Sequence, residues 1–69
     1  DATSLFQFTR LINDHFDQQK KTELIGSLWH VAFADDVLDK HEEAIIRRIA
    51  DLIYVSHSDF IKTKKFAKR

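Results

Sequence analysis

Acidic side chains are concentrated in one short segment, residues 34–43, and carboxylate oxygens are the ligands that hard divalent cations prefer. Five carboxylates lie within nine residues there: Asp35, Asp36, Asp39, Glu42 and Glu43. Their spacing resembles only the second half of a calcium-binding EF-hand loop. The leading ligand positions would fall on Val31 and Phe33, which have no side-chain oxygen. The pattern therefore argues against an EF-hand.

Helix capping accounts for most of this acidic segment without a ligand. Asp39 precedes an apolar-periodic stretch and has Glu42 three residues later, so we expect a capping box in which Asp39 accepts from a backbone amide near Glu42. Glu43 suits the positive end of the same helix. Asp35 and Asp36 are left at the C-terminal end of the preceding helix, where the dipole disfavours negative charge. Two interpretations stay open: solvated or ion-paired carboxylates, which we favour, and a weak site for a divalent metal such as calcium or magnesium.

The sequence lacks the usual patterns of an enzyme or a zinc site. Cysteine is absent, and the four histidines form no pair at i,i+4 spacing on one helix. No glycine-rich segment could hold a phosphate, and no serine or threonine has a base placed beside it. We therefore expect a protein without catalytic residues.

Charge is balanced overall but divided along the chain. Residues 1–43 carry nine acids and four bases, whereas residues 44–69 carry two acids and seven bases, which gives halves of −5 and +5. The zero net charge argues against a specific nucleic-acid partner. The lysine-rich end, residues 62–69, could contact an anionic membrane surface, although a solvated face or a contact with the acidic segment is the simpler interpretation. With no apolar run long enough to span a bilayer and no signal peptide, we expect a cytoplasmic protein.

The elements that would position these residues are helices, because proline is absent and glycine occurs once, at Gly26. Apolar residues at three- and four-residue intervals predict helices over about 4–17 and 21–34, joined by the polar residues 17–21. A third helix is expected after Asp39, and a short fourth after Ser56, which can cap with Asp59. Gly26 lies inside the second helix, and we attribute it to a close approach between helices.

The run from Leu28 to Ile53 resembles the central signature of TerB-like proteins. That signature reads approximately Leu-Trp-x-Val-Ala-x-Ala-Asp-Gly-x-Leu, followed by an acidic helix start and Ile-Arg-x-Ile-Ala. The resemblance implies an all-helical domain, usually about twice this length, with links to tellurite resistance, chemical stress and membrane-linked assemblies. It also implies that Asp35, Asp39 and Glu42, with Glu43 less directly, are candidate metal ligands. Asp36 departs from the pattern, which most often has glycine there.

Together these features predict an all-α fold of about four short helices in a single TerB-like domain, residues 1–69, which we interpret as a C-terminal fragment. We expect a partner copy or further parent sequence to complete the helical bundle. The predicted function is a non-enzymatic binding or scaffold module of the stress-response type, with a weak metal-binding module as the alternative. Six phenylalanines and one tryptophan exceed what four short helices can cover, so we expect a homo-oligomer or another protein to contact the faces around Trp29, Phe6 and Phe66.

Overall fold

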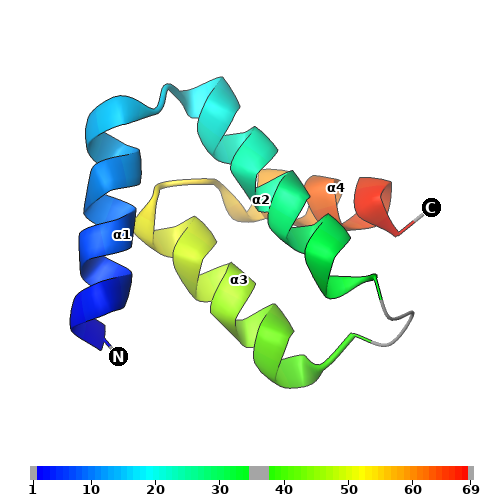
Figure 1. Cartoon of the computed structure of the whole chain (residues 1–69). Coiled ribbons are helices and arrows are strands. Elements are labelled where there is room, and N and C mark those ends of the chain that lie inside the picture. Colours follow the sequence, from blue (N-terminus) through cyan, green and yellow to red (C-terminus); the bar gives the residue numbers. More distant parts are fainter. Residues whose placement is uncertain (1, 35–37, 69) are drawn as a thin grey trace.

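The computed structural model describes residues 2–34 and 38–68, which form four helices. These are α1 (Ala2–His15), α2 (Gln18–Ala32), α3 (Lys40–Leu52) and α4 (His57–Ala67), and no strand occurs in the described ranges. The predicted all-α fold is confirmed (Figure 1). None of these helices is long and apolar enough to cross a membrane.

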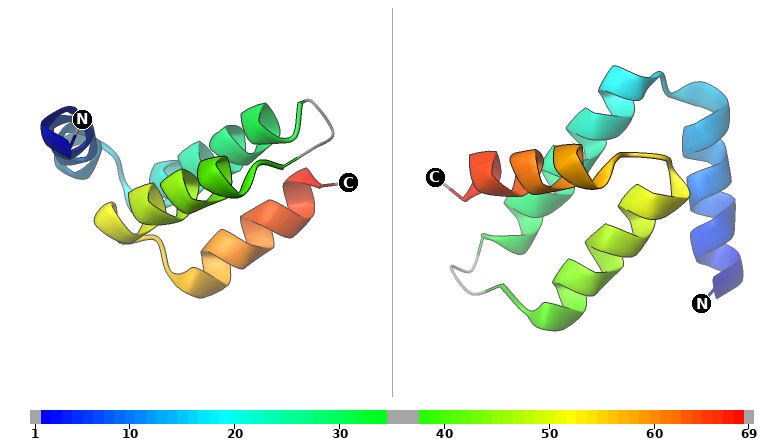
Figure 2. Two further views of the ribbon diagram at one scale, coloured as in Figure 1. Left: turned by 90° about the horizontal axis from the view of Figure 1, so that it is seen from below. Right: turned by 180° about the vertical axis from the view of Figure 1, so that it is seen from behind.

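The helices α2 and α3 lie side by side and form a layer that α4 covers on one face. Figure 2 shows α4 crossing this layer from one side, while α1 stands at its edge next to α3. A side-chain bond ties α1 to the end of α3, since Asn13 donates from Nδ2 to the carbonyl oxygen of Leu52 at 3.0 Å. Among the described residues, no helix lies on the opposite face of the α2–α3 layer (Figures 1 and 2).

The core is centred on Trp29, which is fully buried along with Ile25 and Ile53. The Trp29 ring contacts Phe60 of α4, with ring centroids 5.1 Å apart, and Phe33 at 5.7 Å. From α1, Ile12 is the hydrophobic residue that becomes buried, so α1 contributes little to this core. Three elements, α2, α3 and α4, therefore provide most of the apolar burial that stabilises the fold.

Three helices begin at a residue whose side chain accepts from a free backbone amide of the first turn. Asp17 accepts from Lys20 at 2.8 Å, Asp39 from His41 at 2.9 Å, and Ser56 from Asp59 at 3.1 Å. The Ser56 cap is as predicted. The expected polar connection over residues 17–21 is wrong, because Asp17 caps α2 and the chain turns within two residues. Asp39 is confirmed as the N-cap of α3, but the expected capping box with Glu42 is not seen among the described residues, because the amide that donates to Asp39 is that of His41.

The end of α3 has the geometry of a Schellman motif with tyrosine in the place usually taken by glycine. The amide of Val55 donates to the carbonyl of Ala50 at 2.9 Å, and that of Tyr54 donates to Asp51 at 3.3 Å. Tyr54 has a φ of 63°, in the left-handed region. Its exposed ring lies under Lys21, whose Nζ is 5.6 Å from the ring centroid. This turn sends the chain back across the α2–α3 layer and places α4.

Candidate interaction surface

Large apolar side chains remain exposed on every helix of this small domain. The exposed set comprises Phe6, Phe8, Leu11, Phe16, Val31, Ile45, Tyr54 and Phe66. Single exposed apolar residues are common on protein surfaces, but here the set is nearly as numerous as the buried hydrophobic core. Such a surface is typical of a protein that buries part of it against a partner.

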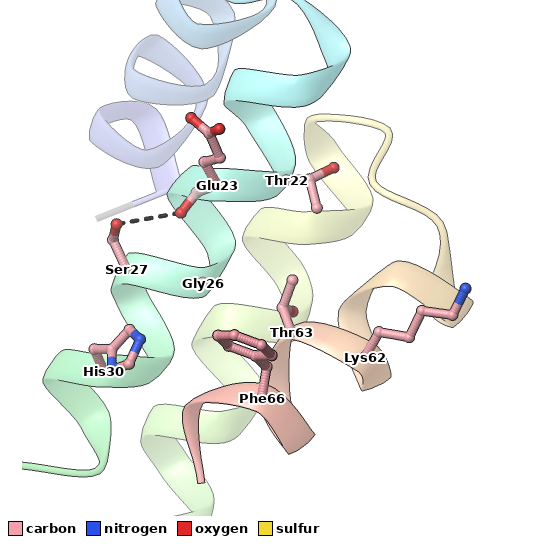
Figure 3. Close-up of a pocket in the computed structure, with 8 residues that line it drawn as sticks. All are labelled: Thr22, Glu23, Gly26, Ser27, His30, Lys62, Thr63 and Phe66. Atoms are coloured by element: carbon pink, nitrogen blue, oxygen red, sulfur yellow. Dashed lines mark hydrogen bonds between the residues drawn. The ribbon is translucent and has the colours of Figure 1, made fainter. Parts of the chain in front are cut away.

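A groove of about 460 Å³ lies between α2 and α4. Figure 3 shows its lining, which comes from both helices: Thr22, Glu23, Gly26, Ser27, His30, Lys62, Thr63 and Phe66. The α2 wall has mostly small or polar side chains, while Phe66 supplies the aromatic surface from α4 and is 68% exposed. The groove is open to solvent and combines an apolar floor with polar rims, as surfaces that bind other helices do.

Gly26 lies in the α2 wall of this groove. From the sequence we attributed this glycine to a close approach between helices, and the structure shows no such approach within the described chain. A Cβ placed at Gly26 would meet no atom within 4 Å, so no neighbouring helix requires the missing side chain. Glycine nevertheless costs about 1 kcal/mol relative to alanine in a helix interior. The fold of this chain alone therefore gives no reason for glycine at this position, and its effect is to leave the groove open.

Opposite charges stand on the two rims of the groove. Glu23 rises from α2, where Gln19 donates to its carboxylate at 3.3 Å, and Lys62 extends from α4 (Figure 3). The two side chains point in different directions, and neither forms an ion pair with any residue in the described part of the chain. Ser27 donates from Oγ to the backbone carbonyl of Glu23 at 3.2 Å, so its hydroxyl faces its own helix. The rims thus keep one carboxylate and one ammonium group available to a partner.

A smaller hollow of about 160 Å³ lies on the other side of α2, between α2 and α3. Its apolar lining includes Leu28, Val31 and Ile45, and Val31 is 74% exposed. Glu42 stands at its edge. This hollow lies on the uncovered face of the α2–α3 layer and is a second apolar surface of the domain.

Two carboxylates of the acidic segment, those of Asp39 and Glu43, have structural roles. Asp39 caps α3, and the carboxylate of Glu43 accepts from Lys64 Nζ of α4 at 2.6 Å. Asp35 and Asp36 lie outside the described residues. Among residues 2–34 and 38–68, no three histidine, aspartate or glutamate side chains come together as metal ligands would. The metal hypothesis for Asp35, Asp39, Glu42 and Glu43 therefore stays a prediction.

The three aromatic residues expected at an interface differ in position. Phe6 is 48% exposed, with the guanidinium carbon of Arg48 5.9 Å from its ring centroid, and Phe66 lines the groove. Trp29 is fully buried. Lys64 Nζ, which also forms the ion pair with Glu43, lies 5.5 Å from the centroid of the Trp29 ring. Trp29 thus lies in the hydrophobic core, while Phe6 and Phe66 reach the surface.

The groove itself was missed by sequence reasoning, which did not bring α2 and α4 together. One signal was present, because Thr22, Gly26 and His30 recur every four residues and mark one side of α2 on which Gly26 has no side chain. The sequence analysis considered Gly26 alone and attributed it to a close approach between helices.

Comparison with known proteins identifies one family. The family model described as Tellurite resistance protein TerB matches residues 1–65 of the 69-residue chain. No curated protein and no solved structure matches the chain.

Proposed function

The chain belongs to the TerB family, and we propose that it acts as a non-enzymatic binding module whose partner is a second copy of itself. The observation that carries this proposal is the set of exposed large apolar side chains on all four helices. Family membership supports the proposed setting, a response to tellurite or related chemical stress.

The small core makes burial of this surface energetically useful. Removing apolar surface from water contributes about 25 cal/mol per Å², and domains of this size have only a few kcal/mol of net stability to begin with. The exposed residues Phe6, Phe8 and Leu11 show that α1 in particular leaves apolar surface in water, since Ile12 is its contribution to the buried hydrophobic set. A second copy would cover surface that no element of the described chain covers.

Binding is favoured over catalysis by the distribution of polar groups. Glu43 and Lys64 neutralise one another, Asp39 caps a helix, and the groove rims carry one acid and one base on opposite sides. A general acid–base pair needs two such groups within reach of one reacting atom. The arrangement suits recognition of a complementary surface.

The concentration dependence of unfolding tests the proposal. If folded copies associate and unfolded chains do not, the thermal midpoint rises with protein concentration by mass action. We expect a clear rise between low and high micromolar chain concentration, followed by circular dichroism at constant buffer and salt. A cooperative transition whose midpoint is the same at all concentrations would contradict self-association.

A further inference from the structure

We propose that two copies of the domain meet at the α2–α4 groove, related by a two-fold axis along the groove, with Glu23 of each copy facing Lys62 of the other. This inference rests on the proposed self-association and adds one surface and a symmetry for it; of the exposed apolar side chains, Phe66 is the one that lines this groove. Three observations on the described residues carry it: the open glycine, the opposite charges on the rims and the shape of the competing surfaces.

Gly26 indicates that something outside this chain approaches α2 closely. Within the chain, a Cβ at this position would meet nothing within 4 Å, although glycine weakens a helix interior. Where a helix has no side chain, a second backbone or an aromatic ring can come nearer to it. The ring of Phe66 borders the same groove and is 68% exposed, so the two copies present matching hollow and aromatic surface.

The charges on the rims select both the partner and the orientation. In a two-fold interface the same patch is used by both copies, so the patch must complement itself. An axis along the groove places α4 of one copy over α2 of the other, so the acidic rim of each copy faces the basic rim of the other. An axis across the groove would place α2 over α2 and bring like charges together, which disfavours that arrangement. A surface with one acidic rim and one basic rim therefore fits a second copy of itself.

Two other hollows of the described residues lack this self-complementary arrangement. The hollow between α2 and α3 has a volume of about 160 Å³ and, among its lining residues, Glu42 is the charged one. The hollow on the outer side of α3 is formed by a single helix and includes Arg47, Arg48 and Asp51, so it has no opposing rims. Of these three surfaces, only the α2–α4 groove combines two helices, opposite charges and a site without a side chain.

Charge reversal on each rim tests the pairing with the full chain. Glu23→Lys and Lys62→Glu each create two like-charge contacts in a homodimer, so we expect each to weaken the dimer at least about tenfold. An equimolar mixture of the two variants restores two opposite-charge contacts, and its affinity should return to near that of the unmodified chain. Asp51→Lys and Arg47→Glu, on the outer side of α3, change the net charge equally and should leave the affinity unchanged.

The outcomes separate this inference from the proposed function. Weakening by both rim variants with recovery in the mixture supports the inference. If the unmodified chain dimerises but the rim variants behave like the α3 controls, or if mixing fails to restore association, the groove pairing is wrong while self-association stands. A monomeric unmodified chain overturns both. Circular dichroism melts of every variant at low concentration confirm that the monomer still folds.

Gly26→Gln gives an independent test, because it separates helix stability from association. Glutamine is a better helix former than glycine and meets no neighbour at this position, so the monomer should melt at a higher temperature. The same side chain fills the groove, and we expect the dimer dissociation constant to rise at least about tenfold. A variant that is more stable and dimerises as tightly as the unmodified chain would overturn the inference.

Discussion

Asp39 fixes the start of α3 through one local contact, and the contact can be tested without reference to any ligand. Its carboxylate accepts from the amide of His41 at 2.9 Å. We expect Asp39→Ala to lower the free energy of unfolding by about 1 kcal/mol, whereas Asp39→Ser should cost much less because it keeps an accepting oxygen. Urea unfolding without added metal measures both. Equal losses for alanine and serine would show that the charge of Asp39, rather than its capping oxygen, is what the turn requires.

Tyr54 provides a second test at the residue scale, because its φ of 63° suits glycine better than any residue with a Cβ. We expect Tyr54→Gly to raise stability by about 0.5–1 kcal/mol, after loss of the Lys21 contact and the flexibility of glycine are counted. Tyr54→Val should lower it, since a β-branched side chain is least compatible with this conformation. Denaturant unfolding ranks the three chains. A valine variant as stable as the glycine variant would contradict the assigned turn.

At the scale of elements, α3 and α4 are joined over the buried Trp29 by the ion pair of Glu43 with Lys64. The Glu43 and Lys64 side chains are 38% and 30% exposed. Solvent therefore screens the pair, and its contribution to the free energy of unfolding is modest. We expect a double-mutant cycle with Glu43→Gln and Lys64→Met to give a coupling of about 0.5–1 kcal/mol that decreases with added salt. A cycle with no coupling at low salt would mean that the contact does not contribute to holding α4 in place.

The order and type of the helices could be predicted because their apolar spacing is regular and two of their caps have clear sequence signals. The start of α2 at Gln18 could not be predicted, because a polar run such as residues 17–21 is compatible both with a loop and with the first turn of a capped helix. In the structure the Lys20 amide donates to the Asp17 carboxylate, so Asp17 is the N-cap and the polar run forms the first turn of α2. The contact between α2 and α4 could not be predicted from the sequence either, because it depends on the turn at Tyr54 and not on any local pattern of residues.

At the scale of the whole molecule, the fold brings a part of the acidic half of the chain next to a part of the basic half. The acidic half supplies Glu23 on α2 and the basic half supplies Lys62 on α4, so the two charged residues that line the groove come from opposite halves of the chain. The candidate site was predictable in part, as Phe66 was expected at an interface and reaches the surface. The place of Gly26 in the wall of the groove could not be predicted, because the spacing of residues in the sequence does not show whether the space beside a glycine is filled.

Sedimentation equilibrium of the unmodified chain tests the central claim, self-association, most directly. Because burying exposed apolar side chains of so small a domain against a second copy is favourable, we expect the weight-average mass to rise from that of the 8.1 kDa chain toward twice that value as concentration increases through the micromolar range. A mass that stays at the monomer value up to high micromolar concentration would contradict the account.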